Sequence, residues 1–406
     1  MAEYFWKTRL NSEGIDFPEY LSFSAYQQMT QCPKQWLLSN AFYPEIWTNR
    51  GYPERLNERT IMGIATHQAL ETVIKKIKEE KIDQDSKDYL NLLKKLGGLR
   101  NILQEEIKKV LKQSKYQGNP RYLRVEKDLH ARITKRYLEE YFIQLRTFLS
   151  KLNLPKVSDL VPPQKNNLKL KKSQSSVMTE YYAKSKVMGW KGIIDLVIQN
   201  NRGATLIDFK TGKEKENHKD QLELYQLIWM TDEKVNQVPI KELIVKYPDK
   251  EKYFKPLSDD QIEEKINQYQ CEVEELKNIF SSDNLAKPSK HCNYCGVKQL
   301  CDDYWDSLKT TKKECERRFG DFEILVLDTS DGQNKDSKIL SSNIADTGLI
   351  VKIFFQDVGD CFRQLFEVNN KVRILNGYYY DNDEEGMAED FSIEIQKTTE
   401  VFLINA

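Results

Sequence analysis

Two short segments in the middle of the chain each end an apolar run on an aspartate. Asp195 closes the segment GIID, and Asp208 lies thirteen residues further on in LIDFK, where Lys210 follows it. Alternate residues of a strand share one face, so we expect Asp208 and Lys210 to lie side by side. A carboxylate and an ammonium on such an apolar strand are costly unless they are paired or used in chemistry.

Carboxylates at strand ends can supply the hard oxygen ligands that Mg²⁺ and Mn²⁺ prefer. Asp195 and Asp208 would hold the metal, and the carbonyl of Phe209 could complete the ligand set. The metal would lower the pKa of a bound water and neutralise charge on a phosphodiester. Lys210 would hold that water or stabilise the transition state. The alternative is a buried Asp–Lys pair with a structural role, because D-x-K is a short motif.

Three more side chains flank this pair in the sequence. His67, in GIATH, falls on the apolar face of a predicted helix, where a packed histidine is the simpler interpretation. Gln221 and Tyr225 are four residues apart and therefore share a face of the helix predicted after LIDFK. None of the three indicates a site on its own.

Taken in order, the motifs GxxxH, GxxD, D-x-K and QxxxY resemble the RecB-type branch of the PD-(D/E)XK nucleases over about residues 22–305. The resemblance implies a restriction-endonuclease-like α/β fold, with a mixed central sheet flanked by helices. It implies that the histidine and the two acids bind the metal, that the lysine is catalytic, and that Gln and Tyr position DNA or the lysine. The residues in these positions are His67, Asp195, Asp208, Lys210, Gln221 and Tyr225. Glu180 also resembles a glutamate of the family, although an exposed strand residue is the simpler interpretation.

The seven cysteines include a cluster that suits metal binding. Cys292, Cys295 and Cys301 form C-x₂-C-x₅-C, and two thiolates on one tight turn suit a zinc ion or an iron–sulfur cluster. We do not expect disulfides, because the chain reads as intracellular. Spacing alone leaves open both the metal and the fourth ligand. The candidates for that ligand are Cys32, Cys271, Cys315 and His291.

A Cys-Pro near the start, followed by C-x₂-C-x₅-C after the nuclease motifs, resembles the iron–sulfur subset of this family. That subset includes AddB, exonuclease V and the CRISPR-associated iron–sulfur exonucleases. The resemblance implies a [4Fe–4S] cluster on Cys32, Cys292, Cys295 and Cys301. Such a cluster would join segments 260 residues apart, which is a structural role. The resemblance also favours exonuclease action on single-stranded DNA ends.

Charge is distributed unevenly, although 62 basic and 62 acidic side chains cancel. Residues 91–176 carry 20 basic and 7 acidic side chains, whereas residues 321–406 carry 7 and 17. Such asymmetry is typical of an anion-binding surface. The candidate phosphate contacts are Lys94, Lys95, Lys108, Lys109, Lys135, Arg136, Lys169, Lys171 and Lys172. Tyrosines among them could stack on bases, or could simply form the core of solvated helices; these are Tyr116, Tyr122, Tyr137 and Tyr141.

Periodicity places these residues on elements. It predicts helices over 61–82, 88–116, 126–152, 218–232 and 258–280, and strands over 177–183, 186–199, 204–209 and 242–247. From residue 321 the chain is β-rich and resembles a small OB-like barrel. We therefore predict a nuclease domain over 1–320, with a basic helical insertion at about 83–176, and an acidic OB-like domain over 321–406.

Other classes of protein are disfavoured. No apolar run reaches the roughly 18 residues of a membrane helix, and the N-terminus lacks a signal peptide, so we expect a cytoplasmic protein. The predicted function is a metal-dependent DNase; the alternative is a non-catalytic DNA-binding or scaffolding subunit of a repair, replication or defence complex. OB-folds often bind single strands through aromatics such as Tyr378, Tyr379 and Tyr380, but the acidic charge opposes this, and a protein-docking or self-regulating role is an equal alternative. The oligomeric state stays open.

Overall fold

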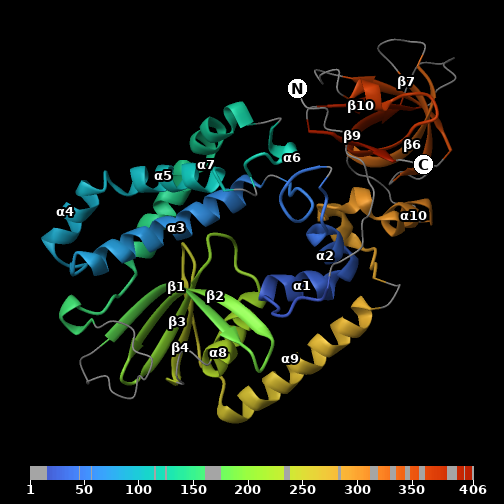
Figure 1. Ribbon diagram of the computed structural model, residues 1–406. Helices are drawn as coiled ribbons and strands as arrows, with labels where there is room; N and C mark the ends of the chain where they lie inside the picture. The colour runs from blue at the N-terminus through green and yellow to red at the C-terminus, as the bar shows by residue number, and fades with distance from the viewer. Residues whose placement is uncertain are drawn as a thin grey trace. The chain divides into compact units, whose positions relative to one another are not determined.

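A computed structural model defines residues 16–44, 46–55, 57–113, 116–123, 126–160, 175–232, 238–281, 285–310, 319–329, 335–342, 348–355, 362–381, 391–396 and 398–404. These residues form two compact units, which are each described separately (Figure 1). The sheet unit comprises residues 16–30 and 55–281 of the described chain, and the barrel unit comprises residues 31–54 and 285–404. No described helix is long and apolar enough to cross a membrane.

The sheet unit is built on five strands in the order β1-β2-β3-β4-β5. β3 and β4 run parallel, and the other neighbours are antiparallel. A parallel pair needs a crossover, and α8 provides it by connecting β3 to β4 while packing on the sheet. This mixed sheet agrees with the predicted core, although the short polar strand β5 was not predicted. The bounds are β1 Ser175–Ser185, β2 Trp190–Asn200, β3 Gly203–Phe209, α8 Asn217–Thr231, β4 Ile240–Lys246 and β5 Glu251–Phe254.

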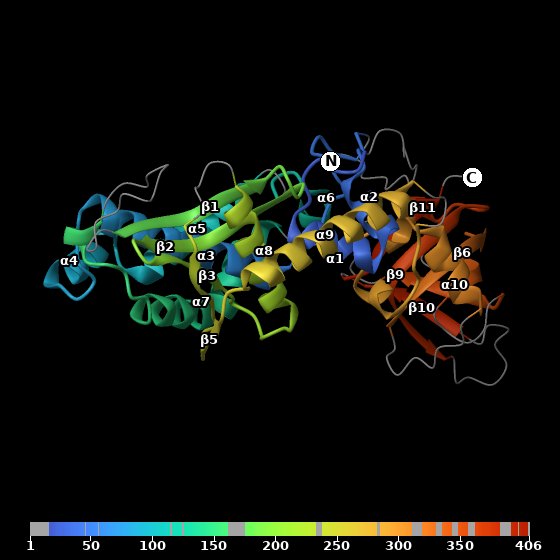
Figure 2. The same cartoon turned by 90° about the horizontal axis from the view of Figure 1, so that it is seen from below.

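Helices α3, α5 and α7 pack together and against the strand residues Ile207, Phe209 and Ile244 (Figure 1 and Figure 2). α3 begins where the side-chain oxygen of Asn57 accepts hydrogen bonds from the backbone N–H groups of Arg59 and Thr60. The helices of this unit are α1 Phe23–Gln31, α3 Glu58–Glu79, α4 Lys87–Lys95, α5 Leu99–Leu111, α6 Pro120–Leu123, α7 Glu126–Ser150 and α9 Asp259–Phe280, with a short 3₁₀ turn at Val157–Asp159.

The prediction of one helix over 88–116 is wrong, because two helices occupy this range. α4 ends before Gly97 and Gly98, whose φ angles are 81° and 86°. These positive values are ordinary for glycine and break the helical ladder, so the chain turns before α5 begins. The tyrosines nearby pack in the core: Tyr116, Tyr137 and Tyr141 are 6%, 8% and 2% exposed. The prediction that these three tyrosines stack on bases is therefore wrong, and the alternative, that they form the core of the helices, is correct. The side chain of Tyr122 lies outside the described residues.

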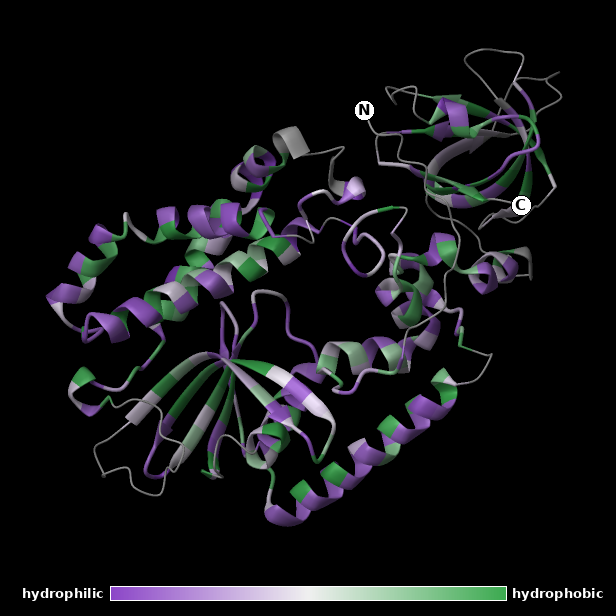
Figure 3. Ribbon diagram, in the orientation of Figure 1, coloured by the Kyte–Doolittle hydropathy of each residue, from purple (hydrophilic) through white to green (hydrophobic). Residues whose placement is uncertain are grey.

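The barrel unit closes five strands into a ring. Its sheet runs in the order β10-β8-β7-β6-β9-β11, and an additional β10–β9 pairing closes the ring, while β11 pairs with the earlier residues of β9. Apolar residues alternate into the core along these strands, which carry long apolar stretches (Figure 3). The strands are β6 Phe319–Asp328, β7 Lys335–Ser342, β8 Ile350–Phe355, β9 Lys371–Asp381, β10 Phe391–Ile395 and β11 Glu400–Ile404. Closure of the five strands β6–β10 into a ring fits the predicted barrel loosely, because β11 remains an edge strand beside β9.

The cysteine-bearing segments belong to this barrel unit. α2 Pro33–Asn40, α10 Asp302–Thr310 and short 3₁₀ turns at Lys290–Tyr294, Lys298–Leu300 and Arg363–Leu365 complete it. Cys292 and Cys295 share a buried cluster with Leu375 of β9 and Phe402 of β11. The predicted boundary near residue 320 therefore falls inside a compact unit, and the division into domains 1–320 and 321–406 stays a prediction.

A buried polar network holds the cysteine segment on the barrel. Arg373 of β9 donates hydrogen bonds of 2.7 Å to Glu323 on β6, to the carbonyl of Gln299 and to Asp302. Its guanidinium also lies 5.1 Å from the ring centroid of Trp305. Because buried ionic groups are costly when one partner is lost, this network fixes the segment firmly against the strands.

Candidate metal centre

Strand register brings Asp195 and Asp208 together. Leu196 of β2 pairs with Ile207 of β3, and this antiparallel register places the next two residues, Asp195 and Asp208, opposite each other. Asp208 is only 2% exposed, and the side chain of Asp195 is 13% exposed. The Oδ2 atom of Asp195 accepts a 2.7 Å hydrogen bond from the backbone N–H of Phe209, which fixes its orientation.

Glu180 extends this row onto a third strand. Thr179 of β1 pairs with Leu196 of β2, so Glu180 lies opposite Asp195 in the same register. Glu180 has a φ of 47°, which is unusual for a residue with a side chain and costs on the order of 1 to 3 kcal/mol. Strain of this kind persists where the surroundings enforce it, and it is concentrated at functional sites. The interpretation of Glu180 as an ordinary exposed strand residue is therefore inadequate.

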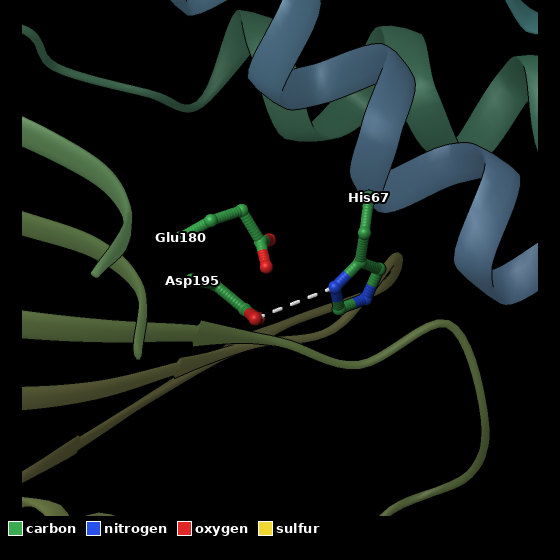
Figure 4. A group of neighbouring side chains, drawn as sticks. All are labelled: His67, Glu180 and Asp195. Carbon is green, nitrogen blue, oxygen red and sulfur yellow. Dashed lines mark ion pairs between the residues drawn. The ribbon is translucent and has the colours of Figure 1, made fainter. Parts of the chain in front are cut away.

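His67 reaches the same place from α3. Its Nδ1 atom lies 3.4 Å from Oδ1 of Asp195. One ligand atom from each of His67, Glu180 and Asp195 lies within 4.8 Å of the others, and Figure 4 shows the two carboxylates pointing toward the imidazole. The motif glycine one turn before the histidine also has a role in packing, because a Cβ on Gly63 would lie 3.0 Å from Oγ1 of Thr211.

Lys210 belongs to a chain of polar contacts beside this group. Its Nζ atom lies 2.8 Å from Oδ2 of Asp208 and donates a 2.8 Å hydrogen bond to Oε1 of Gln221. Gln221 in turn donates a 2.7 Å hydrogen bond to the hydroxyl of Tyr225. The structure thus brings together all six side chains predicted from the motifs. The ring of Phe209 is buried in the core, and its carbonyl as a ligand stays a prediction.

The site has more negative charge than its own cations balance. Burial and the charge of Asp195 raise the pKa of Glu180 to about 7 and that of Asp208 to about 6. Burial of His67 opposes its charged form, but the neighbouring carboxylates outweigh this effect and raise its pKa to about 9. Carboxylates that resist ionisation next to one another are the donor set that a divalent cation would neutralise, so these residues fit Mg²⁺ or Mn²⁺.

The glycine of GxxD is explained by the ring of Tyr225. A Cβ on Gly192 would lie 2.6 Å from Cε1 of that ring. We expect Gly192→Ala to lower the free energy of unfolding by about 1 to 3 kcal/mol and to displace Tyr225 from Gln221. Chemical denaturation measures the change. Gly212→Ala is the matched control, because a Cβ there meets nothing within 4 Å, and an equal loss in both variants would contradict this account.

The four predicted cluster ligands line one pocket in the barrel unit. Cys32, Cys292, Cys295 and Cys301 all contribute to its wall. Among the described residues, however, no three cysteine sulfurs lie within 4.8 Å of one another, since only the His67 group meets that spacing. Burial raises the pKa values of Cys295 and Cys301, the latter to about 12, so these thiols are neutral near pH 7.

The other fourth-ligand candidates have different fates. Cys271 is exposed on α9 in the sheet unit, whereas Cys315 lies outside the described residues. The imidazole of His291 also lines the pocket, and its Nε2 atom is 3.8 Å from the sulfur of Cys292. Sequence spacing could not separate these candidates for the fourth ligand. Which of them lies beside Cys292, Cys295 and Cys301 depends on how α2, which follows Cys32, packs against the cysteine loop.

The predicted DNA-contact residues are less available than their number suggests. Lys95, Lys108 and Lys109 form ion pairs with Glu80, Glu105 and Glu106. The guanidinium of Arg136 lies over the ring of Tyr137, while Lys94 and Lys135 are exposed. The remaining candidates, Lys169, Lys171 and Lys172, lie outside the described residues. Ion pairing on the helix surface thus already occupies three of the candidate phosphate contacts.

Together, the mixed sheet and the clustered histidine, carboxylates and lysine define an α/β protein with a candidate metal site. The chain belongs to the PD-(D/E)XK nuclease superfamily, whose sequence profile matches residues 20–302. The crystal structure of SSO0001 is similar, with 13% identity, a TM-score of 0.21, and coverage of 63% of this chain and 89% of that chain. The crystal structure of protein VC1899 from Vibrio cholerae shows 14% identity, a TM-score of 0.15 and coverage of 64% and 56%. No curated protein matches the chain.

Proposed function

We propose that the protein is a metal-dependent deoxyribonuclease of the RecB type. The observation that carries the proposal is the meeting of His67, Glu180 and Asp195 within 4.8 Å beside the ion pair of Asp208 and Lys210. Hard oxygen ligands and one imidazole suit Mg²⁺ or Mn²⁺, and a neighbouring ammonium suits a reaction that develops negative charge.

The residues divide between holding the cation and assisting the reaction. A bound cation would supply an activated water and charge neutralisation, and His67, Glu180, Asp195 and Asp208 would hold it. Lys210, oriented by its partners, would donate hydrogen bonds to the attacking water or to a phosphate oxygen. Hydrolysis forms a bond from the water oxygen to phosphorus and breaks one P–O bond. The products are a phosphate monoester and a free hydroxyl group.

The proposal includes a [4Fe–4S] cluster on Cys32, Cys292, Cys295 and Cys301. All four thiols line one pocket, which supports a shared group. A single zinc ion binds sulfur at about 2.3 Å in a tetrahedron, so its sulfurs are about 3.8 Å apart. No three cysteine sulfurs of the described chain come within 4.8 Å of one another, so their spacing fits no single zinc site and does not itself support a cluster. The backbone N–H of Ser289 donates a hydrogen bond to the sulfur of Cys292, a contact that tunes such clusters.

We further propose exonuclease action on single-stranded ends, a cytoplasmic location, and a protein partner for the acidic OB-like barrel. A non-catalytic DNA-binding role stays the alternative. Superfamily membership supports contact with DNA, whereas the polarity of cleavage and the biological pathway do not follow from it.

Metal addition and removal test the central claim. We expect end-labelled single-stranded DNA to be cut with Mg²⁺ or Mn²⁺ and left intact in EDTA, because the carboxylates need the cation to bind a phosphodiester. Saturation to 100 times the dissociation constant should stabilise the protein by about 2.7 kcal/mol, measured by thermal unfolding. Duplex and circular substrates separate exonuclease from endonuclease action. DNA binding without cleavage under all these conditions would favour the non-catalytic alternative.

A further inference from the structure

The β1–β2 hairpin continues past the metal group and carries a patterned outer face. Tyr182 pairs with Ile193, and Lys184 pairs with Lys191. Tyr182 and Ile193 are both 48% exposed, although their neighbours Ala183 and Ile194 are completely buried. Two large apolar side chains therefore face solvent as a cross-strand pair, next to two lysines.

This face begins at the proposed metal ligands. Tyr182 is two residues after Glu180 on β1, and Ile193 is two residues before Asp195 on β2. Alternate residues of a strand point to the same side, and two residues span about 7 Å along it. The order along the hairpin is thus an acidic pair, an aromatic and aliphatic pair, and a lysine pair, at even intervals.

The lysine end of the face has an aromatic neighbour of its own. Nζ of Lys184 lies 3.6 Å from the ring centroid of Tyr20, and Lys191 is exposed on the opposite strand. Positive charge at this end complements a phosphate, whereas an exposed tyrosine complements the flat face of a base. A duplex hides its base faces in the stack, so only an unpaired strand offers both groups at once.

We propose that a single strand of DNA lies along the β1–β2 hairpin on its way to the metal centre. One base stacks on Tyr182 against Ile193, and the phosphate beyond it contacts Lys191 and Lys184. The inference rests on the proposed nuclease function and adds the surface that holds the single strand, because stacking on Tyr182 requires unpaired bases. This surface is continuous with the proposed metal ligands, and its lysines complement the charge of a phosphate.

Binding of a fluorescent thymidine oligonucleotide, in Ca²⁺ so that it is not cut, tests the proposal. Alanine substitution at a stacking position weakens binding by about 5- to 100-fold per base, so we expect Tyr182→Ala to fall in this range. Tyr253→Ala is the matched control, because Tyr253 is 60% exposed on β5 at the opposite edge of the same sheet. Lys191→Glu should lower the affinity by a larger factor at low salt than at high salt, because salt weakens contacts with phosphate.

An oligonucleotide with one run of abasic sites separates stacking from a general loss of structure. We expect wild-type protein to bind the abasic strand as weakly as Tyr182→Ala binds either strand. Equal binding of the normal strand by wild type and Tyr182→Ala would overturn the proposal. The proposal would also be overturned if Tyr182→Ala lowered the affinity for the normal strand and for the abasic strand by the same factor. Failure of the wild type to bind single-stranded DNA would overturn it as well.

Hydrolysis of bis(4-nitrophenyl) phosphate with Mn²⁺ keeps the two proposals apart, because this small diester reaches the metal without occupying the hairpin. We expect Tyr182→Ala and wild type to hydrolyse it equally. If neither protein hydrolyses any diester while Tyr182→Ala still loses oligonucleotide binding, the nuclease function fails and the strand path stands.

Discussion

Replacing Lys210 by Met is expected to lower the rate of DNA cleavage by about 10²- to 10³-fold while the protein keeps its fold. The ammonium contacts Asp208 and Gln221, and its removal leaves the buried carboxylates with less opposing charge. The variant should therefore bind Mn²⁺ at least as tightly as wild type. Single-turnover cleavage and calorimetric titration of Mn²⁺ measure the two effects separately.

A ligand variant should behave in the opposite way. Asp208→Asn removes a buried charge that repels Asp195, so we expect loss of both cleavage and Mn²⁺ affinity with a gain in the stability of the metal-free protein.

Lys213→Met is the matched control for Lys210→Met, because Lys213 is exposed on the same loop. Wild-type cleavage by Lys210→Met would refute the catalytic assignment, and a parallel loss of Mn²⁺ binding would reassign the lysine to metal retention.

Replacing Cys292 or Cys32 by Ser is expected to remove the proposed cluster and to destabilise the barrel unit. Cys292 packs among the same buried side chains as Leu375 of β9 and Phe402 of β11. Loss of the proposed iron–sulfur cluster should therefore disturb the packing of these strands. Structural metals contribute on the order of 10 kcal/mol in small domains, and we expect a loss of at least about 5 kcal/mol here. Visible absorbance and iron content of anaerobically purified protein report the cluster, and thermal unfolding reports stability.

The chain offers its own control for this substitution. Cys271 is exposed on α9, so Cys271→Ser should leave iron content and stability unchanged. Iron retained by Cys32→Ser would mean that another side chain, such as His291, completes the ligand set. Stoichiometric zinc in place of iron would refute the cluster while keeping the pocket as a metal site.

The core of the sheet unit could be predicted because its residues are regular. Strand alternation and the motif spacings located Asp195, Asp208 and Lys210 on neighbouring strands, and the helical period placed Gln221 and Tyr225 on one face. These are local patterns, set by the two-residue repeat of a strand and the 3.6-residue repeat of a helix.

Other features could not be predicted because they depend on tertiary contacts. The ion pairs of the basic helices depend on which faces meet, as with Arg100 of α5 and Glu139 of α7. Only the family resemblance pointed to Glu180, because its importance comes from strand register and from a positive φ that the sequence does not reveal. A polar glutamate on a strand is ordinary until the opposite residue is known to be Asp195.

The barrel unit shows the same limit at a larger scale. Charge counting separated residues 321–406 as an acidic domain, yet Arg373 inside it binds Asp302 and the carbonyl of Gln299. A single arginine among many acids is invisible to a net charge. Arg373 matters here because it is 5% exposed and donates hydrogen bonds to groups on both sides of the predicted boundary at residue 320. These are Glu323 after the boundary, and Asp302 and the carbonyl of Gln299 before it.

The discontinuity of the barrel unit has a consequence for biosynthesis. Leu38 of α2 packs in the same cluster as Phe402 of β11, so α2 cannot find its partners until the last strand has left the ribosome. At about 5 to 20 residues per second, the 370 residues between Cys32 and Phe402 take roughly 20 to 75 s to synthesise. The sheet unit, whose residues 16–30 and 55–281 are all made before residue 285, can fold first. Cys32 is thus left as an open thiol during translation, and the proposed cluster would be completed late in maturation.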